Sequence, residues 1–203
     1  MPSATGSIEV ITGPMFSGKS EELIRRVRRA EIARLKIRVF KHAADDRYST
    51  DHVVSHSEWR IRSGVVVAAD EIRSAIGQGV QVVGIDEAQF FGPELLPLVQ
   101  DLARNGVRVI VVGLDMDYLG RPFGPMPLLL AVAEHVTKLD AVCMQCGSPA
   151  HFSQRLVPSS ESVLIGGPHM YEARCRRCFS PVQSGSTGAS PVPFGDSPKV
   201  PTH

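Results

Sequence analysis

The sequence Gly13-Pro-Met-Phe-Ser-Gly-Lys-Ser20 follows an apolar run at residues 8–12 and opens a helix-length segment at residues 20–34. It fits the pattern G-x-x-x-x-G-K-[ST] of the P-loop, a glycine-rich turn between a strand and a helix. The glycines let successive backbone N–H groups point into one concavity, where they and the helix N-terminus bind phosphate oxygens. Because a strand and a helix flank the motif, a chance match in a glycine-containing loop is the weaker interpretation.

The chemistry of the loop identifies its ligand as a nucleoside triphosphate with magnesium. Lys19 is expected to neutralise the β- and γ-phosphates, and the Ser20 hydroxyl to ligate Mg²⁺. The residues expected to contact ATP and Mg²⁺ here are Gly13, Pro14, Met15, Phe16, Ser17, Gly18, Lys19 and Ser20.

Short apolar runs alternate with helix-length segments on both sides of this loop, which is typical of a parallel sheet covered by helices. The runs predict strands at residues 8–12, 36–41, 80–85, 107–114 and 136–142. In the segment at 20–34, Leu23, Val27 and Ala30 form one apolar stripe, as in a helix with one buried face. We therefore expect an α/β fold with a P-loop parallel sheet flanked by helices.

A pair of acidic residues ends the third predicted strand. Asp86 and Glu87 follow the apolar residues 80–85, at the edge of the sheet where P-loop proteins hold magnesium. Asp86 is expected on the magnesium side, through water, and Glu87 points elsewhere and is placed to act as general base. The alternative is two solvent-exposed acids at a strand end.

The four cysteines occur as two pairs, Cys143-x2-Cys146 and Cys175-x2-Cys178. Two such knuckles suit tetrahedral zinc, and four thiolates leave no open coordination position, so the zinc is expected to be structural. Disulfides are the alternative. The residues between the pairs are more numerous than in common zinc sites, which indicates a functional excursion of the chain.

The composition changes along the chain and indicates three parts. We expect a P-loop ATP-binding α/β domain at residues 1–142 and a small zinc-binding lobe at 143–179, which carries few long apolar runs. Residues 180–203 are rich in Ser, Pro and Gly and contain too few apolar residues to fold, so a disordered tail is expected.

Charge and hydropathy exclude several classes of protein. Among the 203 residues, 43% are hydrophobic and 21% charged, and the net charge is +1, so no bulk attraction to nucleic acid is expected. The arginines at 25–29 share their helix with Glu21, Glu22 and Glu31, which favours a solvated helix face over a nucleic-acid surface. No apolar run approaches membrane-spanning length and no export signal is visible, so a cytoplasmic protein without membrane partners is expected.

Taken together, these motifs resemble the zinc-containing, tetrameric thymidine kinases of bacteria and animal cytosol. The resemblance runs from about residue 7 to 179. Its blocks are the P-loop, Asp45-Asp-Arg47-Tyr-Ser49, Asp86-Glu87-Ala-Gln89-Phe90-Phe91, Gly113-Leu-Asp115, Pro122-Phe123-Gly124, Cys143-Met-Gln-Cys146 and Ile165-Gly166-Gly167.

The resemblance implies an enzyme that phosphorylates thymidine, and deoxyuridine, at the 5′-hydroxyl with ATP, in nucleotide salvage for DNA synthesis. It implies that Glu87 is the base and that Asp45 and Arg47 assist at the phosphates and the sugar. A lasso loop would close over the thymine ring. The implied nucleoside-binding residues are Met15, Glu87, Gln89, Phe90, Leu114, Tyr118, Phe123, Ser153, Ser162, Val163, Leu164, Ile165, Gly166 and Tyr171.

Two other functions remain open from the residues alone. Another P-loop nucleoside kinase or NTPase would share every feature up to Asp86. A nucleic-acid-dependent motor or a DNA-binding zinc module would need basic and aromatic residues interleaved along the lobe, and the sequence lacks that pattern.

Overall fold

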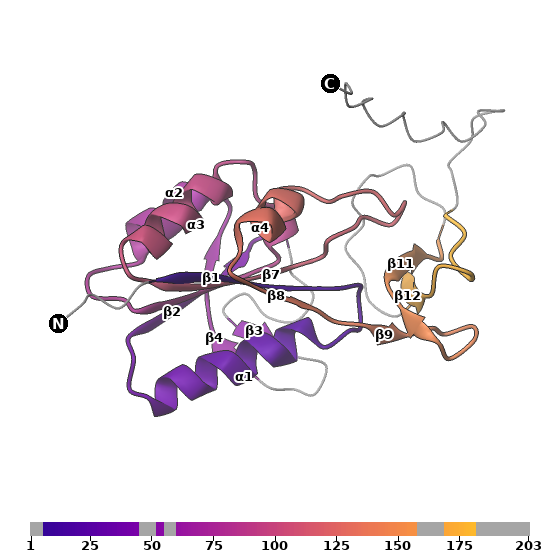
Figure 1. The fold of residues 1–203 in the computed structure, drawn as a ribbon, viewed down its shortest axis with the longest axis horizontal. Coiled ribbons are helices and arrows are strands. Elements are labelled where there is room, and N and C mark those ends of the chain that lie inside the picture. The colour runs from indigo at the N-terminus through magenta and orange to yellow at the C-terminus, as the bar shows by residue number, and fades with distance from the viewer. Residues whose placement is uncertain (1–5, 45–51, 55–59, 158–168, 182–203) are drawn as a thin grey trace, which may run out of the picture.

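The computed structural model describes residues 6–44, 52–54, 60–157 and 169–181 (Figure 1). Its centre is a six-stranded sheet in the order β5-β2-β6-β7-β1-β8, and every strand pair in it is parallel. The strands are β1 (Ser7–Thr12), β2 (Ile37–His42), β5 (Gly64–Val66), β6 (Val82–Asp86), β7 (Arg108–Gly113) and β8 (His135–Lys138). The expected α/β fold is confirmed.

Helices cover both faces of this sheet, with α1 (Lys19–Ile32) on one face and α2 (Ala69–Ala75), α3 (Leu95–Arg104) and α4 (Met126–Val132) on the other (Figure 1). Leu23, Val27 and Ala30 of α1 are buried, as the apolar stripe predicts. They pack against one face of the sheet in a core that also contains Val39 and Ile110. The alternate residues of the strands face α3 and α4. Because both faces of the sheet are covered, the strands are apolar almost throughout.

One predicted strand differs from the structure. The run at 136–142 divides into β8 (His135–Lys138) and β9 (Ala141–Val142). Leu139 N–H still donates to the carbonyl of Thr12 at 2.8 Å, but Thr12 is the last residue of β1. Beyond that point β1 offers no further ladder partner, so the chain leaves the sheet and β9 pairs with β10 (Pro149–Ala150) instead.

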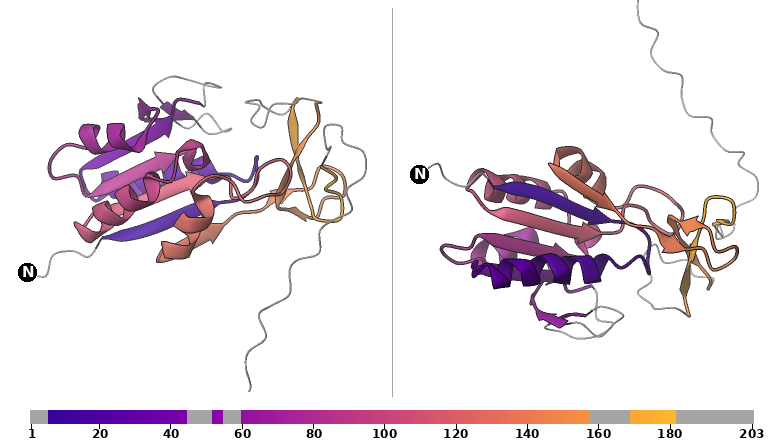
Figure 2. Two further views of the ribbon diagram at one scale, coloured as in Figure 1. Left: turned by 90° about the horizontal axis from the view of Figure 1, so that it is seen from above. Right: turned by 60° about the horizontal axis from the view of Figure 1, so that its bottom comes forward.

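Small antiparallel ladders complete the described chain. β9 and β10 pair near β12 (Tyr171–Arg174), which pairs with β11 (Phe152–Arg155). Figure 2 shows these strands beyond the end of the sheet at which β1 finishes. A third ladder joins β3 (His52–Val54) to β4 (Arg60–Arg62). Among the described residues, no helix has the length and apolar character needed to cross a membrane.

Candidate active site and metal centre

The P-loop has a backbone that only particular residues tolerate. Gly13 has a φ of 142°, and a Cβ at this position would lie 2.3 Å from the Leu139 carbonyl oxygen. Gly18, which caps α1, has a φ of 81°. Both positions therefore require glycine, as the motif predicts. Phe16 also has a positive φ, 66°, which is uncommon for an aromatic residue and is typical of functional sites.

Lys19 folds back over the loop that precedes it. Its Nζ donates to the Pro14 carbonyl at 2.6 Å, and the Ser17 hydroxyl donates to the same oxygen at 2.8 Å. The positive charge thus contacts the backbone of the loop that is expected to bind phosphate. Ser20 follows in the first turn of α1, where the backbone N–H groups at the helix N-terminus and the helix dipole favour anions. The structure therefore brings the predicted ATP-binding residues 13–20 together.

Asp86 and Glu87 diverge at the same edge of the sheet. The Cβ of a residue at Gly84 would meet Leu23 of α1, so this side of β6 faces α1, and Asp86 lies two residues further along the same side. Asp86 is buried and accepts a hydrogen bond from the Glu87 N–H at 2.9 Å. Glu87 itself has a φ of 55°, a left-handed conformation that turns its side chain away from the strand direction.

Gln89 holds the Glu87 carboxylate from the following turn, η1 (Ala88–Phe90). The Gln89 Nε2 donates to Glu87 Oε2 at 2.5 Å, and Gln89 Oε1 accepts from the Leu114 N–H at 3.0 Å. The side chain is 2% exposed. The resemblance assigns Gln89 to nucleoside binding, and the structure places its amide between the predicted base and the end of β7.

The predicted aromatic residues Phe90 and Phe123 lie together beside Glu87. Their ring centroids are 5.8 Å apart with planes at 89°, an edge-to-face contact. The backbone of the loop that contains Phe123 approaches the turn at Gln89 closely, since a Cβ at Gly124 would lie 2.2 Å from the Gln89 carbonyl oxygen. Phe90, Leu114 and Phe123 are each partly exposed rather than part of the core. An apolar surface therefore lies next to the predicted base.

Ser153 of β11 connects the lobe to the P-loop. Its hydroxyl oxygen accepts a hydrogen bond from the Met15 N–H at 3.0 Å, and the residue is 5% exposed. Phe16 packs against the cluster that contains Cys143 and Cys175. The tip of the P-loop thus contacts both β11 and the cysteines, and the predicted residues Met15 and Ser153 are adjacent.

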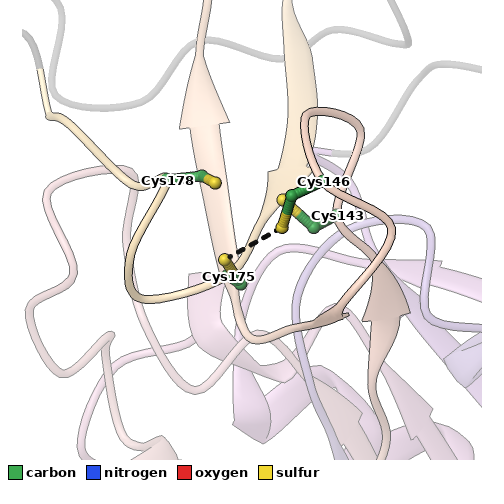
Figure 3. A group of neighbouring side chains, drawn as sticks. All are labelled: Cys143, Cys146, Cys175 and Cys178. Carbon is green, nitrogen blue, oxygen red and sulfur yellow. Dashed lines mark hydrogen bonds between the residues drawn. The ribbon is translucent and has the colours of Figure 1, made fainter.

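The four cysteines converge on one point, although they come from two separate turns (Figure 3). Their Sγ atoms all lie within 4.8 Å of one another, and the Sγ atoms of Cys146 and Cys175 are 3.6 Å apart. No disulfide joins them. The spacing and the four sulfur ligands fit a tetrahedral metal site, so the structure favours the metal interpretation over disulfides.

Local hydrogen bonds prepare part of this cluster for a cation. The hydroxyl and the N–H of Ser148 donate to Cys146, which lowers the pKa of its thiol to about 5. Loss of solvent contact and hydrogen bonds to the neighbouring thiols raise the pKa of Cys178 to about 12. A metal ion is the partner that would hold all four as thiolates, because it binds only the deprotonated sulfur.

Two further residues near the site were not predicted from the sequence. Lys41 is 3% exposed and is the register partner of Asp86 in the parallel pair of β2 and β6, so the two side chains leave the sheet on the same face. A lysine that ends an apolar strand was a signal available in the sequence. Arg155 is the last residue of β11 and is 5% exposed, and nothing in the residue pattern marks it.

Seven predicted site residues lie outside the described residues. They are Asp45, Arg47, Ser162, Val163, Leu164, Ile165 and Gly166. Tyr118 and Tyr171 are described, and both contact the Arg155 guanidinium.

Comparison with known proteins gives the family. The thymidine kinase family model matches residues 6–179, which include the P-loop, the Asp86-Glu87 pair and all four cysteines. The chain belongs to the thymidine kinase family. A thymidine kinase from Rhodothermus sp. (strain ITI 518) is 52% identical over 198 residues, covering 97% of this chain and 92% of the relative. In this member of the thymidine kinase family, the match therefore spans the sheet and the cysteine lobe together.

Proposed function

We propose that this protein transfers the γ-phosphoryl group of ATP to the 5′-hydroxyl of thymidine, and also accepts deoxyuridine. The observation that carries the proposal is the meeting of a P-loop and the Asp86-Glu87 pair at one edge of the sheet, in a chain of the thymidine kinase family. Phosphate chemistry follows from the site, and the choice of nucleoside follows from the family.

The phosphates of ATP bind to the loop amides at residues 13–20. Lys19 neutralises the β- and γ-phosphates, because its ammonium already lies over the loop, 2.6 Å from the Pro14 carbonyl oxygen. The Mg²⁺ that accompanies ATP would be held by Ser20 and, through water, by Asp86, and would neutralise charge on the phosphate oxygens. Asp45 and Arg47 assist at the phosphates and the sugar.

Glu87 takes the proton from the 5′-hydroxyl as that oxygen attacks the γ-phosphorus. The bond from oxygen to phosphorus forms as the bond to ADP breaks, and the proton moves to the carboxylate. Gln89 supports this role because its amide donates to Glu87 Oε2 at 2.5 Å and so fixes the direction of the carboxylate. The left-handed backbone of Glu87 is the kind of local strain that functional sites retain.

The thymine ring binds among apolar side chains next to Glu87. The partial exposure of Phe90, Leu114 and Phe123 supports this, because side chains that served only the core would be fully buried. The other proposed contacts are Met15, Tyr118, Ser153, Tyr171 and the lasso residues 162–166.

We propose that the cysteine cluster binds structural zinc. The convergence of Cys143, Cys146, Cys175 and Cys178 supports a metal, and four sulfur ligands make zinc the best match. We also propose an ATP-binding domain at 1–142, a zinc-binding lobe at 143–179 and a tail at 180–203, with the metal anchoring the lasso.

We also propose a cytoplasmic homotetramer that has no nucleic-acid or membrane partner. One edge of the sheet supports self-association, because β8 is an edge strand and carries Val136, which is 49% exposed. Leu128 of α4 is also half-exposed. Light scattering coupled to size-exclusion chromatography tests the assembly, and a monomer at micromolar concentration would contradict it.

A thermal-shift panel across nucleosides tests the proposed substrate. With ATP analogue and Mg²⁺ present, thymidine is expected to raise the melting temperature more than any ribonucleoside or purine deoxynucleoside. Stabilisation by a different nucleoside, with none by thymidine, would indicate another nucleoside kinase. ATP hydrolysis that depends on DNA and not on thymidine would indicate a motor.

A further inference from the structure

Arg155 is a buried cation in the cysteine lobe, at the end of β11. It is 5% exposed, and a buried guanidinium is costly unless its charge and its N–H groups find partners. Two tyrosines supply part of that environment. The Arg155 Cζ lies 3.5 Å from the centroid of the Tyr118 ring and 5.7 Å from that of Tyr171, and Nη2 donates to the Tyr171 hydroxyl at 3.3 Å.

These two tyrosines come from different parts of the chain. Tyr118 lies in the loop that follows β7 of the parallel sheet and precedes α4, whereas Tyr171 is the first residue of β12. Arg155 and Tyr171 are also register partners in the β11–β12 ladder. The guanidinium therefore joins a loop of the sheet to the lobe, through a stacked face on one side and a hydrogen bond on the other.

The same strand face also contacts the P-loop. Side chains two residues apart on a strand share a face, so Ser153 and Arg155 leave β11 on the same side. Ser153 accepts the Met15 N–H at 3.0 Å, and the next N–H along the chain from Arg155, that of Leu156, donates to the Met170 carbonyl at 2.8 Å. One short strand thus contacts the P-loop tip and the two tyrosines.

We propose that Arg155 is a positioning residue for nucleoside recognition. Its planar guanidinium, stacked on Tyr118 and bonded to the Tyr171 hydroxyl, sets the orientation of both rings, and the nucleoside base binds against them. This rests on the proposed function, since Tyr118 and Tyr171 are proposed contacts of the base. A planar cation is essential to the role, because a lysine ammonium cannot stack on one ring while donating in the fixed direction of the other.

Substitution of Arg155 tests this role through the KM for thymidine measured against the KM for ATP, because a purely structural role would not change the first alone. Arg155→Lys keeps the charge and is expected to raise the KM for thymidine roughly tenfold or more, with the KM for ATP and the metal content unchanged within about twofold. Arg176 is the matched control: its Cζ lies 5.1 Å from the Phe152 ring centroid, but it is exposed. Arg176→Lys is expected to leave both KM values unchanged.

A double-mutant cycle shows whether Arg155 acts through the tyrosine. Tyr118→Leu alone should raise the thymidine KM, and adding it to Arg155→Lys should raise the KM by clearly less than the product of the two single effects. If Arg155→Lys is insoluble, Tyr171→Phe carries the test, since loss of the hydroxyl should raise the thymidine KM about threefold or more without changing the KM for ATP.

The outcomes separate this proposal from the function on which it rests. Wild-type protein that does not phosphorylate thymidine would overturn the proposed function. If the wild type is active, any of three results would overturn the role of Arg155 alone. They are a normal thymidine KM in Arg155→Lys, a double variant whose thymidine KM rises by the product of the two single effects, and, where Tyr171→Phe is used, an unchanged thymidine KM in that variant.

Discussion

Replacing Gln89 with methionine should separate catalysis from stability, because the side-chain amide has two different partners. Methionine keeps the volume and removes both hydrogen bonds, one to Glu87 Oε2 at 2.5 Å and one from the Leu114 N–H at 3.0 Å. A hydrogen bond to a charged group contributes about 1.5–3 kcal/mol, so a misdirected carboxylate would lower kcat by roughly 10- to 150-fold.

The second partner predicts a loss of stability. The Leu114 N–H becomes an unpaired donor in a packed region, since a Cβ at Gly113 would already lie 2.7 Å from Gln89 Oε1. An unpaired donor of this kind costs about 1–3 kcal/mol, which for a chain of this size lowers the melting temperature by roughly 2–12 °C.

The assay is steady-state kinetics with thymidine and ATP, together with thermal unfolding of the same samples. Gln78→Met is the matched control, because Gln78 is exposed and should change neither quantity. The expected result for Gln89→Met is a fall in kcat and in melting temperature, with the KM for ATP unchanged. A kcat within twofold of wild type, whatever the melting temperature, would refute the orienting role of Gln89.

Three further predictions address the base, the metal and the acid stability of the fold. Glu87→Gln should keep nucleotide binding while kcat falls roughly 100-fold or more, as for loss of a general base; near wild-type turnover would exclude that role. Cys146→Ser should lose bound zinc, measured by elemental analysis, and should weaken thymidine binding more than ATP binding. Because Phe16 of the P-loop packs on the cysteine cluster, ATP binding should also weaken, but by less than thymidine binding. Full thymidine affinity in metal-free protein would argue against a connection between the metal and thymidine binding. Burial raises the pKa of Glu9, but hydrogen bonds from Arg108 and Arg26 outweigh it and the pKa lies below its usual 4.5. Its contribution to stability is therefore present above about pH 4.5 and is lost as pH falls through the lowered pKa, so Glu9→Gln should lower stability at pH 7 and flatten the loss in acid. Urea unfolding from pH 7 to pH 3 measures this, and parallel curves for the two proteins would contradict it.

The sequence predicts the local part of this structure well. Gly13 and Gly18 are required by backbone geometry that the motif itself encodes, and the apolar stripe of α1 follows from its period alone. The cysteine spacing likewise predicts the convergence of four sulfur atoms. For the loop and the helix, the physical cause lies within a few neighbouring residues.

Tertiary contacts account for what the sequence does not show. The Met15 N–H and the Ser153 hydroxyl are adjacent only because the lobe folds back on the P-loop. The strand predicted at 136–142 ends early because β1, its ladder partner, ends at Thr12. Lys41 stands out as a lysine at the end of an apolar strand, but its pairing with Asp86 is known only from the register, and Arg155 looks like an ordinary strand residue until the stacked tyrosine is known. Residue patterns carry no information on such pairings.

The most direct test of the account is a phosphorylation assay with purified protein, ATP, Mg²⁺ and thymidine, with the product identified by mass and by the position of the phosphate. Thymidine 5′-monophosphate and ADP are expected in equal amounts, with no comparable ATP consumption without the nucleoside. ATP consumption at the same rate without thymidine, or no phosphorylated thymidine, would contradict it.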